Sequence, residues 1–478
     1  MRIPTVFAIA AGILAAGACA SMGRSGPFLA AAAICALMGV GANFGTNGVR
    51  AVVLTCLLLV PDIPSGRNLG LLVHWSAGLT LSNFIIPALA LPMIAGAWMA
   101  GARLWSKPWP GFAVWSLVLL GWCLLTLAVP LIGGQIQALQ AATLLAHLLK
   151  LGMFLLFGVL LAAPDPDWRR IAERLLIIGI VVNDAVGLAQ AAGWLSAFSP
   201  LAQADAGAGT RASGLFYDAN MYGVLCAWAL LWLLTCKQGG REWRAFLGRG
   251  VLIAATAANL LASDSRAGFA ALATGALVLL FLGHRRVMLQ VLVLTLLAAV
   301  LFPQRSWQRV SAAFTTLGEL ASSPRAANAH TDVATAERLA SMGQALRQIA
   351  SHPLLGLGFG RSLYLGVPQI DAGPVRPALQ GDFQGAQNMG LTVLTETGPI
   401  GLLLLGLALA ASVRRLLPLA SQAPGAAAFL AGFLGLLVAC LTIEALWNAR
   451  VLALVVMLTA GSVALARPAP ILLEAAAA

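Results

Sequence analysis

Two arginines stand where polar sequence meets an apolar run, and residues of this type can grip a phosphate group. Arg211 opens the sequence Arg-Ala-Ser-Gly-Leu-Phe-Tyr-Asp-Ala-Asn at 211–220, and Arg266 lies in Ser-Asp-Ser-Arg-Ala-Gly at 263–268. The planar guanidinium fork binds phosphate oxygens in pairs and keeps its charge at physiological pH. A charge beside hydrocarbon is costly unless it is paired, so neutralisation of Arg266 by Asp264 remains the structural alternative.

A third polar sequence leads into another apolar run. It reads Gln387-Asn388-Met389-Gly390-Leu391-Thr392 and continues to Glu396-Thr397-Gly398-Pro399-Ile400-Gly401. Glu396 is an acid at the head of that run, where it can take up a proton, cap the helix or pair with an arginine. The three sequences together predict a polar site at the edge of an apolar domain.

The elements that must position these residues are membrane helices. Hydrophobic residues make up 60% of the 478 residues and charged residues only 10%, against about 25% in soluble proteins. Long uninterrupted apolar runs favour helices over an outer-membrane barrel. We predict an all-α polytopic integral membrane protein with about 11–14 transmembrane helices and one large extracytoplasmic loop. The expected spans are 3–20, 27–44, 49–61, 83–102, 111–131, 141–163, 171–193, 216–236, 250–264, 266–283, 287–302, 389–411, 425–445 and 450–466, of which 49–61 and 250–264 are short enough to be tilted, broken or re-entrant.

Short basic loops give the orientation. They alternate with nearly uncharged turns and contain Arg103 and Lys107, Arg169 and Arg170, Lys237 to Arg249, Arg285 and Arg286, and Arg414 and Arg415. Such loops stay in the cytoplasm, which also accounts for most of the net charge of +12 without a nucleic-acid partner. The three polar sequences are then expected on the opposite, periplasmic face.

The polar interval 303–387 contains seven arginines and no lysine. Within it, Leu339, Met342, Leu346 and Ile349 recur at helical spacing and predict an amphipathic helix over 334–350. We expect domains at 1–302 (membrane helices with both site arginines), 303–388 (a periplasmic cap) and 389–478 (C-terminal membrane helices).

Other chemistry has little support in the sequence. Seven cysteines fall in or beside apolar runs and lack metal-ligand spacing, and no H-E-x-x-H, P-loop or C-x-x-C pattern occurs. We therefore expect no metal and no cofactor. Three ionisable residues lie inside predicted spans, and they could form a buried pair or line a path for a lipid diphosphate or a proton: His147, Lys150 and Asp184.

Four motifs resemble the O-antigen ligase and polymerase superfamily of bacterial envelope glycan assembly. They are R-x-S-G-x-F-x-x-x-N at 211–220, S-R-x-G at 265–268, S-H-P-L-L-G-L-G-F-G at 351–360 and N-x-x-L-x-x-L-x-E-x-G-x-x-G at 388–401. The resemblance implies transfer of a glycan from undecaprenyl diphosphate to an acceptor sugar hydroxyl outside the cytoplasmic membrane. It also implies that Arg211 and Arg266 hold the diphosphate.

The chain departs from that family at Gln387, where many ligases carry a histidine before the motif asparagine. An amide accepts no proton at neutral pH, so Gln387 can orient a substrate but cannot be a general base. The remaining candidates for the base are His352, His330, Asp382 and Glu396, although His352 before a proline also fits a plain helix end. The predicted catalytic residues are Arg211, Arg266, Gln387, Glu396 and His352, and the predicted substrate-binding residues are Asn220, Asn388, Arg338, Arg361 and Gly358.

The sequence thus predicts a polyprenyl-diphosphate-dependent glycosyltransferase of the inner membrane. Its partners would be the lipid-linked glycan, an acceptor glycan or glycolipid, membrane lipid and other glycan-assembly proteins. The missing histidine slightly favours a polymerase of exopolysaccharide or O-antigen. Ligation to lipid A-core in lipopolysaccharide biosynthesis is the alternative, and a lipid-linked glycan flippase is the rival from another class, although no clear repeat supports it.

Overall fold

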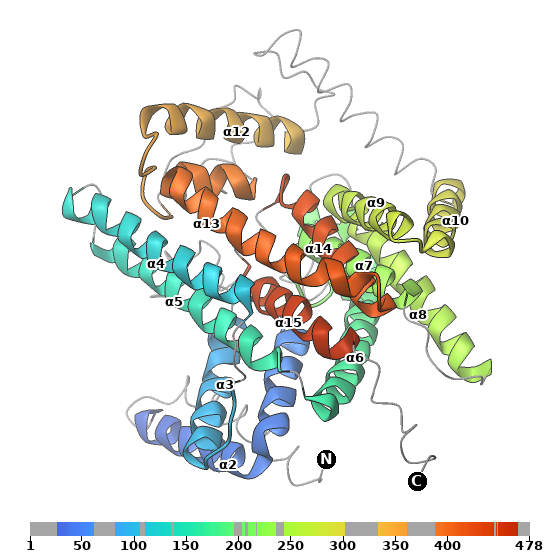
Figure 1. The fold of residues 1–478 in the computed structure, drawn as a ribbon, viewed down its shortest axis with the longest axis horizontal. Coiled ribbons are helices and arrows are strands. Elements are labelled where there is room, and N and C mark those ends of the chain that lie inside the picture. Colours follow the sequence, from blue (N-terminus) through green and yellow to red (C-terminus); the bar gives the residue numbers. More distant parts are fainter. Residues whose placement is uncertain are drawn as a thin grey trace.

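The computed structural model describes residues 26–61, 82–105, 110–134, 138–163, 165–195, 203–205, 209–216, 218–235, 243–301, 333–360, 388–443, 446 and 448–466. Thirteen helices occur in this part of the chain (Figure 1). They are α2 (Gly26–Leu59), α3 (Ser82–Met99), α4 (Gly111–Ile132), α5 (Ala138–Leu161), α6 (Pro166–Ala191), α7 (Ala219–Thr235), α8 (Trp243–Ser263), α9 (Arg266–Phe281), α10 (Arg285–Leu301), α12 (Val333–Ser351), α13 (Met389–Ala420), α14 (Pro424–Ala439) and α15 (Ala449–Ala466).

The predicted class, an all-α polytopic membrane protein, is confirmed. Four helices are long and apolar enough to cross a membrane, with apolar stretches at Ile34–Leu59, Gly111–Ile132, Leu144–Leu161 and Met389–Ala420. Six shorter apolar helical stretches accompany them. A small antiparallel hairpin was not predicted; it pairs β1 (Gln203–Asp205) with β2 (Gly209–Arg211) and ends at the first site arginine.

Most helix boundaries lie within a few residues of the predicted spans. The short run at 250–264 is the second part of α8, a full helix of 21 residues. The run at 49–61 continues α2 beyond a break at Gly45, whose φ of 65° is left-handed. The amphipathic helix expected over 334–350 is α12, and Figure 1 shows it lying across the N-terminal part of α13. The predicted first span, 3–20, lies outside the described residues.

Helices α7, α9 and α14 pack closely against one another. A Cβ added to Gly268 of α9 would lie 2.7 Å from the backbone of Gly223 on α7. A Cβ on Gly435 of α14 would lie 2.4 Å from the carbonyl oxygen of Ala271 on α9. Small residues at crossings let helix backbones approach closely, which is how helices associate in lipid. This approach holds the first turn of α9 firmly against α7.

A second group of helices covers one side of this core. Helix α13 packs on α4, and α15 packs on α5 (Figure 1). The aromatic ring of Phe112 on α4 meets that of Phe433 on α14 edge to face, with the centroids 6.4 Å apart. Helices α4 and α5 are therefore held against the C-terminal helices by apolar contacts.

A polar cluster closes the end of the bundle opposite the site arginines. Arg50 donates from Nε to the carbonyl of Leu160 and from Nη2 to that of Leu104, and its Nη1 lies 4.0 Å from the Asp165 carboxylate. Burial opposes ionisation of Asp165, but hydrogen bonds from Asn47 and backbone N–H groups, together with Arg50, leave its pKa below the usual value. This carboxylate therefore stabilises the fold at neutral pH, and that contribution is lost as the pH falls through its pKa.

Candidate active site

Arg211 is fixed by three hydrogen bonds to neighbouring elements. Its Nε donates to the carbonyl of Ser263 at 2.9 Å, and its Nη2 donates to Asn220 Oδ1 at 3.0 Å and to the carbonyl of Asp264 at 3.2 Å. The acceptors come from the last turn of α8, the following junction and the first turn of α7. The first and second motifs, more than 40 residues apart in sequence, are thus joined by this side chain, and Ser265 Oγ adds a second link by donating to the carbonyl of Asn220 at 3.3 Å.

The chain makes a tight turn between α8 and α9. Asp264 has a φ of 50°, the left-handed region that side chains other than glycine, asparagine and aspartate rarely enter. Ser265 then caps α9 by accepting the Gly268 N–H at 3.0 Å, and Arg266 is the first residue of the helix. A capping serine fixes where a helix begins, so the junction sets the position of Arg266 relative to Arg211.

The start of α13 lies at the same end of the bundle. Helices α9 and α14 run antiparallel, with Gly275 facing Ala431 and Gly435 facing Ala271. This register brings the N-terminal end of α9 to the C-terminal end of α14. There the Met389 N–H donates to the carbonyl of Cys440 at 2.9 Å.

Asn388 anchors that start of α13. Its Oδ1 caps the helix by accepting the Leu391 N–H at 3.0 Å, and its Nδ2 donates to the carbonyl of Leu441 at 2.9 Å. The side-chain oxygen of Asn220 likewise accepts a hydrogen bond from Arg211. Both predicted substrate-binding asparagines therefore have a positioning role in the structure.

The loop after Arg211 is held by two buried amides that the sequence analysis did not single out. Gln190 Oε1 accepts the N–H groups of Ser213 and Gly214, both at 2.9 Å, and its Nε2 donates to the carbonyl of Gly214 at 3.0 Å. Asn183 Oδ1 accepts the Leu215 N–H at 3.1 Å. The two amides lie about two helical turns apart on α6, on the same face of the helix. This spacing is the only sign in the sequence that they act together.

A buried arginine supports the same loop from another helix. Arg450 is only 1% exposed and donates from Nη1 to the carbonyl of Leu215 at 3.3 Å and from Nε to that of Leu57 at 2.9 Å. Its guanidinium lies 4.4 Å from the centroid of the Phe216 ring, within cation–π range. The loop that follows Arg211 is therefore tied to α2, α6 and α15.

The 351–360 motif completes a break in α13. Gly398 interrupts the helix with φ 69° and ψ −173°, and Pro399 has no N–H to donate. The carbonyls left open are satisfied from outside the helix. Leu357 N–H donates to Thr395 O at 2.8 Å, Gly358 N–H to Glu396 O at 2.9 Å, and Trp122 Nε1 of α4 to Thr397 O at 2.9 Å.

The break in α13 also places the predicted residues Gly358, Glu396 and His352. Gly358 has a φ of 97°, and its backbone N–H bond to Glu396 holds this loop against α13. Glu396 is 2% exposed within the break. His352 is exposed at the end of α12, where its backbone N–H donates to the carbonyl of Gln348 and its ring Nδ1 lies 2.9 Å from Ser351 Oγ. The backbone hydrogen bond of His352 is thus the one expected of a residue at a helix end.

Several predicted residues lie outside the described part of the chain: His330, Arg361, Asp382 and Gln387. Arg338 belongs to α12, but its side chain is not among those described. Their proposed roles remain predictions.

The intramembrane ionisable residues do not form the pair of Lys150 and Asp184 considered from the sequence. Lys150 Nζ lies 3.4 Å from His147 Nδ1, one turn earlier on α5. The His147 ring lies 6.2 Å from that of Phe359, next to the loop that docks on α13. Asp184 instead contacts polar side chains of α7 and α8.

The arrangement brings two arginines to one end of the bundle. Two arginines are carried by rigid elements, and the loop and the helix junction beside them are pinned by hydrogen bonds. Preorganised donors of this kind stabilise developing negative charge without reorganising. In the described residues, no group of three or more His, Cys, Asp or Glu side chains is arranged to hold a metal ion.

A family model described as O-antigen ligase matches residues 251–406, about a third of the chain. The matched range contains the α8–α9 junction, α12, the 351–360 loop and the break in α13. The resemblance to the O-antigen ligase and polymerase superfamily is confirmed by this match, and it supports a membrane enzyme of the ligase or polymerase type. No curated protein matches the chain significantly.

Proposed function

We propose that this protein is a glycosyltransferase that moves a glycan from undecaprenyl diphosphate to a hydroxyl of an acceptor sugar. The observation that carries the proposal is the convergence of Arg211, the α8–α9 junction with Arg266 and the start of α13 at one end of the bundle. Three of the four family motifs lie inside the matched range. Lipid-linked diphosphate is the ligand that such an arginine pair beside apolar helices suits best.

Departure of the polyprenyl diphosphate develops negative charge on its oxygens. Arg211 is bound through Nε and Nη2 to acceptors on three elements, so its orientation is set before substrate arrives. Interactions that strengthen as the leaving group departs lower the barrier more than interactions made equally with the ground state. We assign Arg211 and Arg266 to this role.

The acceptor hydroxyl needs a proton acceptor if base catalysis contributes. Glu396 lies in the break of α13 beside Thr397, whose carbonyl is held by Trp122. We propose Glu396 or His352 as the base and Gln387 as an orienting amide. General-base assistance is worth about 10²–10⁴-fold, so Glu396→Gln or His352→Ala should lower turnover by that order and Gln387→Ala much less. Turnover abolished only in Gln387→Ala would make the amide part of the catalytic centre.

The finer assignment is a polymerase of exopolysaccharide or O-antigen in the bacterial inner membrane, acting on the periplasmic face. The absence of histidine at Gln387 favours it over ligation to lipid A-core. In this proposal 303–388 forms a periplasmic cap over membrane domains at 1–302 and 389–478. A flippase for a lipid-linked glycan is the competing function.

The glycan profile of a deletion strain separates these cases. Loss of long chains with accumulation of single lipid-linked repeats supports the polymerase, and unligated lipid-linked polymer supports the ligase. Repeats trapped on the cytoplasmic leaflet would indicate the flippase. For topology, a cysteine at Ala350 of α12 should react with an impermeant maleimide in outer-membrane-permeabilised cells, in a cysteine-free background. The matched cysteine at His284, between α9 and α10, should react only after lysis.

A further inference from the structure

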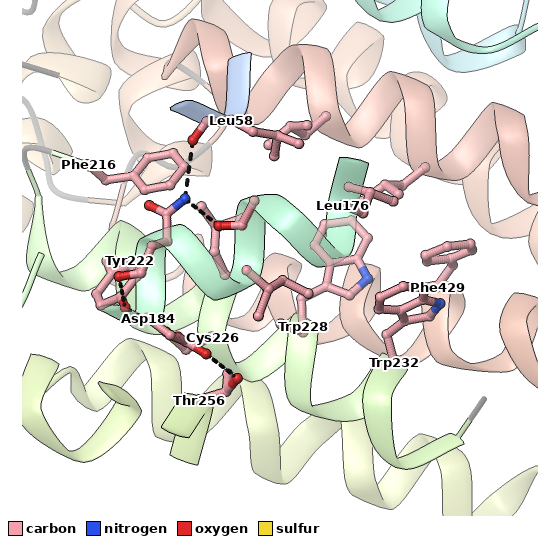
Figure 2. A pocket seen from close by; sticks show the side chains of 17 residues that line it. Leu58, Leu176, Asp184, Phe216, Tyr222, Cys226, Trp228, Trp232, Thr256 and Phe429 are labelled. Atoms are coloured by element: carbon pink, nitrogen blue, oxygen red, sulfur yellow. Dashed lines mark hydrogen bonds between the residues drawn. The ribbon is translucent and has the colours of Figure 1, made fainter. Parts of the chain in front are cut away.

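Two adjacent leucines outside the predicted membrane spans are largely exposed, in the turn that follows α12. Leu354 is 74% exposed and Leu355 is 44% exposed. Apolar side chains inside the bundle are covered instead, as Trp228 and Phe429 are around the internal pocket in Figure 2. A contiguous exposed apolar patch marks a contact with a partner or with a membrane. We call Leu354 and Leu355 the leucine pair.

The main chain of the leucine pair packs against the break in α13. A Cβ on Gly398 would lie 2.1 Å from the carbonyl oxygen of Leu354 and 3.2 Å from the carbonyl carbon of Leu355. Two residues further along, the Leu357 N–H donates to the carbonyl of Thr395 at 2.8 Å. The main chain is thus held on α13 while both leucine side chains stay exposed.

The surface of α13 next to the leucine pair belongs to a helix that can cross a membrane. The stretch Met389–Ala420 is long and apolar enough for this. Just after the break, Ile400 and Leu403 are exposed. Exposed apolar side chains on a helix of this kind face the hydrocarbon of the bilayer.

The other side of the same loop meets α4, where the situation is similar. A Cβ on Gly358 would lie 2.6 Å from the Pro130 side chain. On either side of that proline, Val129 and Ile132 are exposed, and α4 is also long and apolar enough to cross a membrane. The loop that carries the leucine pair therefore bridges two helices whose outer surfaces face lipid.

The sequence around the leucine pair fits hydrocarbon better than a protein surface. Residues 353–360 contain no charged side chain and no side chain that can form a hydrogen bond. Protein interfaces contain about one hydrogen bond per 100–200 Å², which this segment could supply only from its main chain. Polar side chains resume on both sides, at His352 and Arg361, as is usual where a segment enters and leaves the edge of a bilayer.

We propose that Leu354 and Leu355 insert into the lipid bilayer beside α13 and α4, and that this contact holds the 356–358 loop on the break in α13. The partner is the boundary between headgroups and acyl chains, in the leaflet at the end of the bundle where α13 begins. Apolar side chains of interfacial segments reach this depth. Because Glu396 lies in the break, the lipid contact also supports the candidate base, and this last step alone rests on the proposed function.

Spin labels test the lipid contact without any substrate. In a cysteine-free background, nitroxide labels on Leu354→Cys and Leu355→Cys are compared in nanodiscs with two controls on α13. Leu403→Cys is the lipid-facing control, and Ser421→Cys, in the polar turn after the helix, is the water-facing control. Labels at the leucine pair should collide with oxygen as often as the label on Leu403→Cys. They should collide several-fold less often with a water-soluble nickel chelate than the label on Ser421→Cys.

Two results would overturn the proposal. Frequent collision with the chelate at both leucine positions would place the pair in water. Infrequent collision with both reagents would show that protein covers the pair, whether another segment of this chain, a second copy or another protein. Neither result depends on whether the protein transfers glycan.

Hydrogen exchange tests whether the lipid contact holds the loop. The N–H groups of Leu357 and Gly358 are bonded to α13 and should exchange slowly in nanodiscs. The double variant Leu354→Ser/Leu355→Ser should exchange them roughly tenfold faster or more, because moving a leucine side chain from hydrocarbon to water changes an equilibrium by at least about that factor. The matched control Leu354→Ile/Leu355→Ile keeps the apolar surface and should exchange like the wild type. Unchanged exchange in the serine variant, or equally fast exchange in both variants, would refute the anchoring role.

Discussion

Replacing Arg211 by lysine keeps the charge but removes the fork that the structure holds in place. The guanidinium occupies two donor positions, with Nε on Ser263 and Nη2 on Asn220 and the carbonyl of Asp264. A lysine has one nitrogen and cannot fill both positions. Because hydrogen bonds from a charged group contribute about 1.5–3 kcal/mol each and this side chain is half-buried, we take about 1.5 kcal/mol for the lost position.

A second loss of similar size is expected at the diphosphate, because one lysine nitrogen cannot both keep one of these protein contacts and hold the diphosphate where the guanidinium does. Together these correspond to about 3 kcal/mol, or roughly a 100-fold lower turnover, since about 1.4 kcal/mol is tenfold in rate. The assay is acceptor-dependent release of undecaprenyl diphosphate by purified protein, with abundance and monodispersity measured in parallel. The matched control is Arg285→Lys, an exposed arginine at the start of α10, beyond the C-terminal end of α9. Normal turnover in Arg211→Lys would refute the reasoning and leave Arg211 as a topological charge.

Two further predictions concern the supports of the site. Gly398→Ala should lower the free energy of unfolding by about 3 kcal/mol or prevent folding, because its φ is 69° and the new Cβ would lie 2.1 Å from the carbonyl oxygen of Leu354. Gly406→Ala in the same helix meets no atom within 4 Å and should melt like the wild type; equal melting temperatures for both would contradict the structure of the break. Gln190→Leu removes three hydrogen bonds to the 213–214 loop and should cost about 3 kcal/mol of stability at about 1 kcal/mol each, together with most of the activity. A variant that melts normally and transfers glycan normally would show that the loop does not depend on this amide.

The helices were largely predictable because membrane spans are long and uniformly apolar. The capped starts at Arg266 and Met389 agree with the predicted boundaries to within a residue. The joining of the first two motifs is consistent with their predicted place on one face, since Arg211 contacts Ser263 and Asp264 directly.

The supports of the site were not predictable. A single polar residue in an apolar run, such as Gln190, Asn183 or Arg450, marks an unusual position but does not reveal its partner, which lies on another helix. The break in α13 has a local signal in Gly398-Pro399, yet the donors that complete it come from α4 and the 351–360 loop. These features depend on contacts between different helices, and the residue spacing within one helix does not predict such contacts.

Transfer by the purified protein tests the central claim most directly. The protein is placed in nanodiscs with an undecaprenyl-diphosphate-linked repeat and an acceptor glycan, and released undecaprenyl diphosphate and extended glycan are measured together. We predict that both appear in equal amounts, depend on the acceptor, and disappear in Arg266→Ala while Arg285→Lys retains them. No release by a folded protein, with movement of the intact lipid-linked glycan across proteoliposome membranes instead, would contradict the assignment as a glycosyltransferase.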